Sequence, residues 1–218
     1  VLMSDPIIFA LISIALIFAL CVHEFSHGVT AYYYGDETAY RSGRLTLNPL
    51  AHLDPIGSLM ILFIGFGYAK PVPVNPSNLN NPRLDMIKVA AAGPISNFIL
   101  SFIGIFIYTA LIKINLIKPS NSIFFYYFIM INTYLGLFNL IPIYPLDGGQ
   151  IFGNFILKYD RNAFIKLNQY GPKILLVAIL LSIMTNGKIS PLRWFITIPA
   201  EFIVDKFESI AKLILFFI

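Results

Sequence analysis

Long apolar runs separated by short polar segments dominate the chain. Three runs, at about residues 7–34, 86–112 and 123–143, are long enough to cross a bilayer as helices. A fourth run at residues 56–67 is short and carries three glycines, so we expect it to form a re-entrant hairpin or to lie at the interface. The pattern therefore predicts an all-α polytopic membrane protein with a core of three helices.

The remaining segments are less regular. We expect a small extended or β element near residues 40–48 and 69–75, where β-branched residues, turn residues and prolines disfavour a helix. Residues 173–218 predict one or two further helices. The charges within residues 200–218 favour a helix that lies on the membrane instead of crossing it.

Composition supports the membrane assignment. Hydrophobic residues make up 57% of the 218 residues and charged residues only 12%, whereas soluble domains are about 45–50% apolar and about 25% charged. Such a composition excludes a soluble globule, a disordered chain and a nucleic-acid-binding protein. The single cysteine, Cys21, excludes an intrachain disulfide and a cysteine-based zinc cluster. We expect residues 1–218 to form one membrane-embedded domain with a core at about residues 7–170.

Two of the three histidines belong to the pattern His23-Glu24-Phe25-Ser26-His27 in the first apolar segment. In a helix, positions i and i+4 share one face, so both imidazoles can reach the same metal ion. Glu24 stands beside the first histidine, where it can act on a metal-bound water. Ionisable residues inside a membrane segment are costly, and this favours a functional site.

A catalytic zinc ion usually takes three protein ligands and leaves one position for water. The sequence leaves the third ligand open, and the candidates are His52, Asp5, Asp36, Glu37, Asp54, Asp85, Asp147, Asp160, Glu201, Asp205 and Glu208. Asp147 stands out because it lies where a membrane segment ends. Pro142 and Pro145 disrupt regular helix before it, and Gly148 and Gly149 after it permit a sharp turn.

Several ordered motifs resemble the site-2 protease family of intramembrane zinc metalloproteases, in its compact bacterial branch without PDZ or CBS domains. The motifs are HExxH in the first helix, Gly93-Pro94-Ile95-Ser96-Asn97 in the second, Asn139 through Leu146-Asp147-Gly148 in the third, and the loop segments 43–49, 52–57 and 69–75. The resemblance covers about residues 8–170. It implies one zinc ion held by His23, His27 and Asp147, with Glu24 as general base and Asn139 near the zinc.

The function that this resemblance implies is a zinc-dependent endopeptidase that cleaves in or near transmembrane segments. Its partners would be a transmembrane substrate and the lipid bilayer, with no nucleic acid. One alternative is a membrane metal-ion transporter, although ionisable groups gathered at one depth favour a single site. The other is a catalytically silent relative that only binds membrane partners, against which the intact set His23, Glu24, His27 and Asp147 argues.

The distribution of charge distinguishes two topologies. His23 lies 16 residues past Ile7, and Asn139 lies 16 residues past Ile123. At about 1.5 Å per residue, both lie about 24 Å along their helices. If residues 56–67 do not cross the membrane, the two residues are therefore at matching depth. Nine Lys and Arg residues then fall on one side and four on the other, whereas a full crossing removes this bias. The positive-inside rule therefore favours the re-entrant arrangement, with the zinc towards the cytoplasmic side of a bacterial plasma membrane.

Roles can also be assigned to other polar and small residues. Asn139 can donate a hydrogen bond to an oxyanion or to a neighbouring helix. We expect Asn97 to be structural, Gly93 to allow close helix packing, and His52 to brace its loop. Residues 69–75 are expected either to hold a substrate by strand addition or to form a plain extended connector.

Overall fold

The computed structural model describes residues 5–54, 56–57, 69–119 and 122–217, and these ranges contain helices and no strand. The elements are α1 (Pro6–Tyr33), α2 (Thr38–Arg41), α3 (Pro49–His52), the 3-10 turn η2 (Pro76–Asn78), α5 (Pro82–Lys113), α6 (Ile123–Asn139), α7 (Asp147–Leu157), α8 (Arg161–Met184), the π-helical turn η4 (Arg193–Thr197) and α9 (Ile198–Phe216). Three of them, α1, α5 and α8, are long and apolar enough to cross a membrane. The all-α polytopic fold is therefore confirmed.

Side-chain caps determine where the long helices begin. Asp5 accepts hydrogen bonds from the backbone N–H groups of Ile7 and Ile8 at 2.9 and 3.2 Å. Asn81 and Asp160 cap α5 and α8 in the same way. These caps satisfy N–H groups that have no partner inside the helix, which matters most where little water is available.

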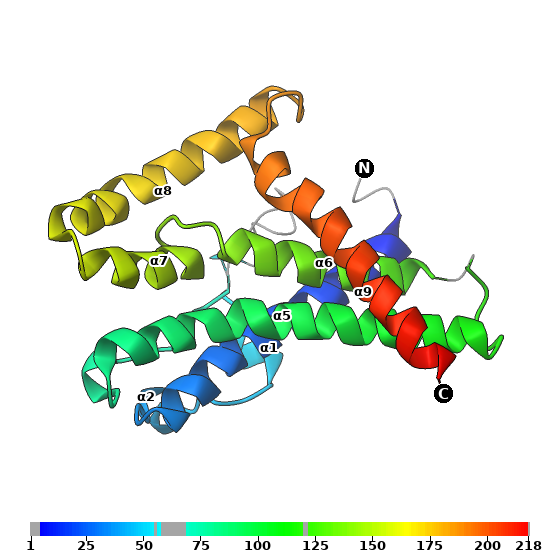
Figure 1. The fold of residues 1–218 in the computed structure, drawn as a ribbon, viewed down its shortest axis with the longest axis horizontal. Coiled ribbons are helices and arrows are strands. Elements are labelled where there is room, and N and C mark those ends of the chain that lie inside the picture. Colours follow the sequence, from blue (N-terminus) through cyan, green and yellow to red (C-terminus); the bar gives the residue numbers. More distant parts are fainter. Residues whose placement is uncertain (1–4, 55, 58–68, 120–121, 218) are drawn as a thin grey trace.

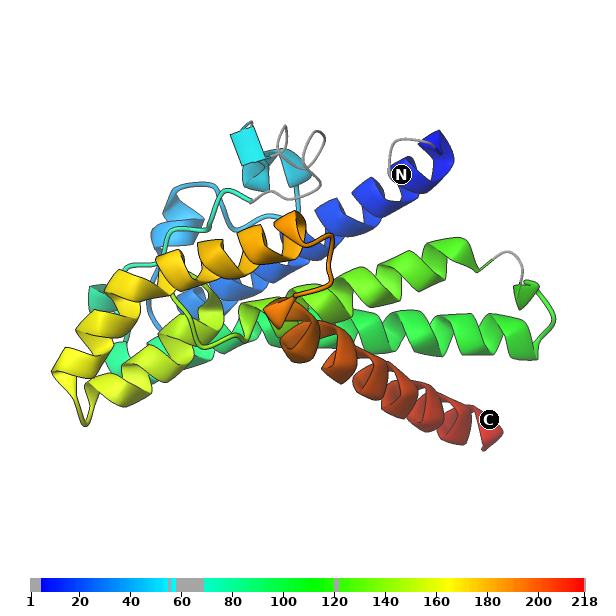
Figure 2. The same ribbon diagram turned by 90° about the horizontal axis from the view of Figure 1, so that it is seen from above.

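Helices α1, α5 and α6 pack against one another and form the centre of the molecule. In Figure 1, α5 runs across the middle, α6 lies above it, α1 passes behind and α9 crosses in front; α5 is antiparallel to both α1 and α6, as Figure 2 also shows. One apolar cluster joins Ile105 of α5, Ile129 of α6 and Ala211 of α9. Helices α7 and α8 form a hairpin, and α8 leads back to the segment before α9 (Figure 1).

The observed ends of the core helices differ slightly from the predicted ones. Helix α6 stops at Asn139 and not near residue 143, because Pro142 cannot continue a helix. Helix α8 begins at Arg161 and not near residue 173, since Asp160 caps it there. Helix α7 lies in a stretch to which the sequence assigns no helix, and α9 packs along α5 and α6.

The extended element expected near residues 40–48 is wrong. Thr38–Arg41 forms the helical turn α2, which an ion pair of 2.9 Å between Glu37 and Arg41 supports, and the residues that follow form turns. Within the described ranges, the β-bridge found joins Leu53 to Ala69. Residues 69–75 are non-helical, as expected. The hairpin expected near residues 56–67 lies almost wholly outside the described residues and stays a prediction.

Asp36 anchors the segment that follows α1 and is fully buried. It accepts hydrogen bonds from the backbone N–H of Asn75, the backbone and hydroxyl of Thr38, and the side-chain amide of Asn78. Burial alone would raise the pKa of Asp36, but the hydrogen bonds from these three residues outweigh it and hold the pKa below its ordinary value. The carboxylate thus ties residues 75–78 to the end of α1.

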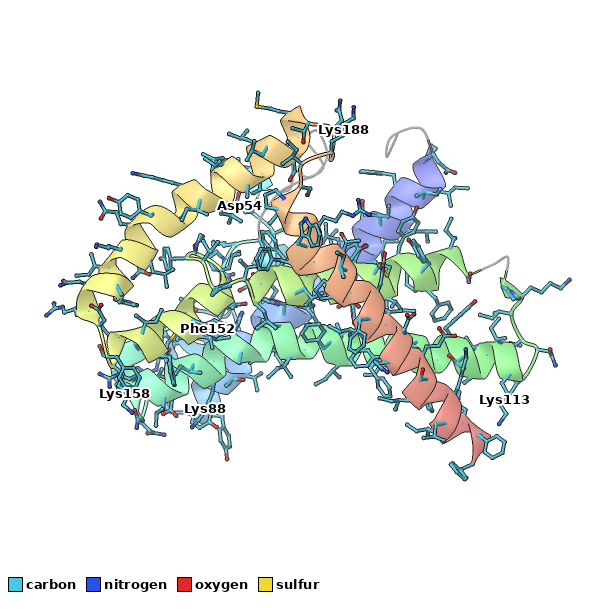
Figure 3. All side chains as sticks on the ribbon, turned by 45° about the horizontal axis from the view of Figure 1, so that its top comes forward. Asp54, Lys88, Lys113, Phe152, Lys158 and Lys188 are labelled. Atoms are coloured by element: carbon cyan, nitrogen blue, oxygen red, sulfur yellow. The ribbon has the colours of Figure 1, made fainter. Side chains whose placement is uncertain are left out.

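Basic residues lie at both ends of the molecule. Figure 3 shows Lys88 and Lys158 at one end of the molecule, on α5 and at the end of α7, and Lys113 at the opposite end of α5. Lys113 donates to the backbone carbonyl of Leu215 at 2.5 Å, next to the last residue of α9. A cation is favourable at the carboxyl end of a helix, so this contact helps to hold α9 against α5.

Candidate metal centre

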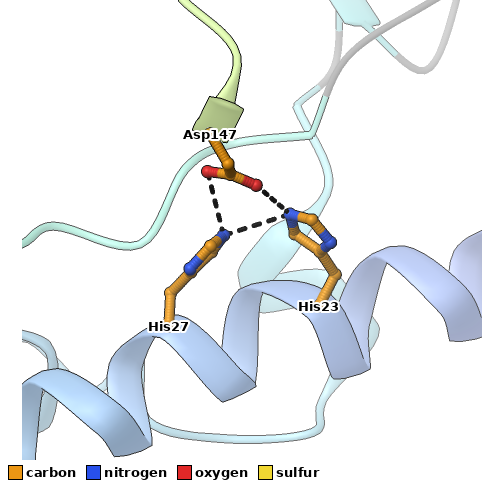
Figure 4. Close-up of side chains that lie close together, drawn as sticks. All are labelled: His23, His27 and Asp147. Atoms are coloured by element: carbon orange, nitrogen blue, oxygen red, sulfur yellow. Dashed lines mark hydrogen bonds and ion pairs between the residues drawn. The ribbon is translucent and has the colours of Figure 1, made fainter. Parts of the chain in front are cut away.

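His23, His27 and Asp147 meet where α1 passes the start of α7 (Figure 4). The Nε2 atoms of the two histidines lie 3.0 Å apart. Asp147 Oδ2 is 3.1 Å from His23 Nε2, and Asp147 Oδ1 is 3.4 Å from His27 Nε2. One ligand atom from each residue lies within 4.8 Å of the others, and across the described part of the chain no further His, Cys, Asp or Glu joins this group.

Both imidazoles are oriented by hydrogen bonds at their other nitrogen. His27 Nδ1 is 2.7 Å from the carbonyl of Val89, which can only accept, so Nδ1 carries the proton. His23 Nδ1 is 2.6 Å from Asn97 Oδ1. The Asn97 amide nitrogen donates to Ala19 O, so its oxygen faces the histidine and accepts from Nδ1–H. Both Nε2 atoms therefore present lone pairs to the shared site.

This arrangement fits a metal cation. When both imidazoles are neutral, their two lone pairs and a carboxylate converge within hydrogen-bond distance, and they would repel one another without a positive charge. Asp147 Oδ2 is buried without a hydrogen-bond partner. Two nitrogens and a carboxylate oxygen are a donor set that zinc accepts in catalytic sites. The residues present therefore fit the zinc ion that the sequence predicts.

Gly93 allows α5 to pass close to this site. A Cβ at residue 93 would lie 2.5 Å from His27 Nε2 and 2.6 Å from His23 Nε2, closer than real side-chain carbons approach any atom. The predicted close packing at Gly93 is confirmed, and the atoms that it approaches are those of the candidate ligands. A side chain here would displace both imidazoles.

Asp147 is placed by a helix start and not by an open turn. It is the first residue of α7, after Leu146 at the N-cap. A Cβ at Gly148 would lie 2.3 Å from the carbonyl oxygen of Leu140, and one at Gly149 would lie 2.5 Å from the backbone nitrogen of Tyr144. The two glycines are thus required for close packing of the helix on the preceding loop, instead of the sharp turn expected of them.

The other predicted residues have defined contacts. Glu24 accepts a hydrogen bond from the backbone N–H of Val72 at 2.8 Å. Asn139 is the last residue of α6 and donates to Leu135 O at 3.0 Å within its own helix. The catalytic roles of Glu24 and Asn139 stay predictions. His52 is buried and donates to Thr46 O at 2.7 Å, which agrees with the expected bracing role.

Asn97 is the site residue whose role the sequence underestimates. Besides His23, it bonds to Asn132 Oδ1 at 3.1 Å, and both asparagines are fully buried. Asn97 follows Gly93 by four residues, so the two share a face of α5, and this spacing is the signal that points to the site. These bonds agree with the structural role expected of Asn97, and the contact with His23 places that role at a candidate ligand.

Comparison with known proteins identifies the family. The model of "Peptidase family M50" matches residues 11–121 and 110–183, which together cover most of the chain. The chain belongs to peptidase family M50. This M50 chain is 41% identical over 169 residues to the protein of Bacillus subtilis (strain 168) named "Putative zinc metalloprotease YwhC", a match that covers 75% of this chain and 77% of that protein.

More distant M50 relatives carry similar names. The chain is 26% identical to "Putative zinc metalloprotease Rip2" of Mycolicibacterium smegmatis, over 86% of this chain and 73% of that protein. It is 25% identical to a zinc metalloprotease of Methanocaldococcus jannaschii, over 84% of this chain and 46% of that protein. No solved structure gives a significant match. The chain is thus an M50 metalloprotease, and the resemblance to site-2 proteases is confirmed.

Proposed function

We propose that this metalloprotease is an intramembrane endopeptidase that holds one zinc ion on His23, His27 and Asp147. The observation that carries the proposal is the convergence of three lone-pair donors inside a bundle of apolar helices, with the proton-bearing nitrogens turned away. The names of the relatives indicate that the metal is zinc and that the reaction is proteolysis. The substrate class follows from the setting, since a site among membrane helices meets peptide bonds in or near transmembrane segments.

The chemistry divides between the metal and the chain. A bound zinc ion polarises a peptide carbonyl and lowers the pKa of a bound water to about 7. Glu24 takes the proton of the attacking water and passes it to the leaving amine. Asn139 Nδ2 has two hydrogens, of which the contact with Leu135 O uses one, and the other donates to the oxyanion. Asn97 and Val89 keep the ligand imidazoles in the required tautomer.

The proposed orientation places the zinc towards the cytoplasmic side of a bacterial plasma membrane. The parallel course of α1 and α6, and the end of the molecule that Lys88 and Lys158 share, support this orientation (Figures 1 and 3). The partners are then the bilayer and a transmembrane protein or peptide, which enters as substrate.

A comparison of cleavage by matched variants tests the proposal. The purified wild type is expected to contain one zinc ion per chain and to cleave a model transmembrane peptide, whereas Glu24→Gln retains zinc and loses cleavage. Glu37→Gln is the matched control, because Glu37 is exposed and pairs only with Arg41 in the contacts described. Equal cleavage by wild type and Glu24→Gln would overturn the mechanism, and metal-dependent ion flux without proteolysis would favour a transporter.

A further inference from the structure

The carboxylate of Glu24 is held by the backbone of a distant segment. Its Oε2 atom accepts the N–H of Val72 at 2.8 Å. Val72 lies in the extended segment of residues 69–75, between Pro71 and Pro73. Neither proline has an N–H and both restrict the backbone. A backbone amide cannot rotate independently as a side chain can, so the position of this donor is set by whatever fixes the segment.

Contacts on both sides of Val72 fix the segment. Arg44 Nη2 donates to the carbonyl of Lys70 at 2.7 Å and to that of Pro71 at 3.3 Å. The backbone N–H of Lys70 donates to His52 O at 2.8 Å. Beyond Val72, the Asn75 N–H donates to the buried carboxylate of Asp36 at 2.7 Å. Arg44 is a charged side chain whose two acceptor carbonyls directly precede the held amide of Val72.

Packing seats the same segment against the face of α1 that carries Glu24. Val72 is buried, with 8% of its surface exposed. Gly28 follows Glu24 by one helical turn, and a Cβ there would lie 3.0 Å from Leu45 Cδ1 and 3.3 Å from Val72 Cγ1. The glycine therefore leaves room for these side chains, and the Val72 amide reaches the carboxylate one turn earlier.

We propose that Arg44 is a positioning residue for Glu24 and acts through the Lys70 and Pro71 carbonyls and the Val72 amide. The inference rests on the proposed function, because it assigns Arg44 to the general base of that reaction. The amide holds Oε2 by a charge-assisted hydrogen bond, which leaves Oε1 for the proton of the attacking water. The Val72 N–H is thereby committed to the enzyme and is not a donor for strand addition of a substrate.

Steady-state kinetics on a model transmembrane peptide test this assignment. Arg44→Ala is expected to lower kcat by about 10- to 100-fold, because a misplaced general base loses its alignment. KM and the zinc content are expected to stay at the wild-type values, since Arg44 donates to the backbone carbonyls of Lys70 and Pro71 and not to the candidate metal ligands. Arg44→Lys restores part of kcat, because one ammonium cannot reproduce the planar guanidinium that spans both carbonyls.

The matched control is Arg41→Ala, which removes the same charge three residues away. Arg41 is exposed and pairs with Glu37, so its replacement is expected to leave kcat unchanged. A double-mutant cycle with Glu24→Asp separates positioning from a general structural effect. The shortened carboxylate no longer reaches the amide, so Arg44→Ala should cost less than about twofold in that background.

Three results would overturn the inference. The first is an unchanged kcat in Arg44→Ala. The second is a raised KM at constant kcat in the same variant, which would assign residues 69–75 to substrate binding. The third is that the losses in kcat from Arg44→Ala and Glu24→Asp are additive in the double-mutant cycle. If Arg44→Ala does not fold, Arg44→Lys and Arg44→Gln replace it in the same cycle. Failure of the proposed function has a different signature, because the wild type itself would then show no zinc-dependent cleavage.

Discussion

Replacement of Gly93 by alanine is predicted to weaken zinc binding strongly without unfolding the helix bundle. The added Cβ would lie 2.5 Å from His27 Nε2, which is 0.9 Å inside the 3.4 Å at which ordinary van der Waals contact begins. The obstructing atoms belong to imidazoles fixed by Asn97 and Val89, so they cannot rotate away without losing those hydrogen bonds. Alanine otherwise favours a helix over glycine by about 1 kcal/mol.

The expected loss follows from the tolerance of zinc coordination. Zinc–nitrogen distances in proteins lie within about 0.2 Å of about 2.0–2.1 Å, so a displacement several times larger than this tolerance breaks the site. Weakened support of a metal ligand already costs about 10- to 100-fold in affinity. We therefore expect Gly93→Ala to lose at least about 100-fold in zinc affinity, or about 2.8 kcal/mol.

Competition with a chromophoric zinc chelator measures this loss, and metal analysis of the purified protein gives the stoichiometry. Gly104→Ala is the matched control: it lies on the same helix, and the nearest atoms to its added Cβ belong to the rotatable side chains of Phe128 and Ile129. Circular dichroism of both variants should match the wild type. Retention by Gly93→Ala of one zinc ion per chain at wild-type affinity would refute the assignment of the site.

Three further predictions concern the supports of the site. Asn97→Ala should weaken zinc binding by about 10- to 100-fold in the same competition assay, whereas Ser101→Ala, which removes a buried hydrogen bond on the same helix to Thr133, should not; equal affinities would contradict the role of Asn97. Because the pKa of folded Asp36 lies below its ordinary value, its stabilisation is present above about pH 4 and is lost as the pH falls through the folded pKa. Asp36→Asn should therefore lower the apparent Tm by about 4–8 °C near neutral pH, with a difference from wild type that narrows in acid; a difference independent of pH would contradict this. Removal of zinc by a chelator should lower the Tm of the wild type, since a ligand that binds only the folded state stabilises it, and leave the Tm of Gly93→Ala unchanged.

The features that follow from the sequence are those set by local pattern. Hydropathy and proline positions predict α1, α5 and α6 to within a few residues, since burial in lipid demands long apolar helices. The spacing of His23 and His27 predicts a shared face of one helix. The charge bias predicts that α1 and α6 run in the same direction, and this brings Asp147 to the histidines.

Features that depend on contacts between distant segments do not follow from the sequence. The bond between Asn97 and His23 depends on how α5 is rotated against α1, which hydropathy does not determine. The bond between Val72 and Glu24 joins a loop to a helix across a long stretch of chain. Residues near Thr38 form a helical turn because local hydrogen bonds and an ion pair outweigh the strand preference of β-branched side chains.

X-ray absorption at the zinc edge tests the central claim most directly, because it reports the donor atoms around the metal. The purified wild type, loaded with one zinc ion per chain, should show two imidazole nitrogens at about 2.0–2.1 Å with oxygen donors completing the shell. A third imidazole, which would bring in His52, or a sulfur at about 2.3 Å, which would bring in Cys21, would contradict the proposed set of His23, His27 and Asp147.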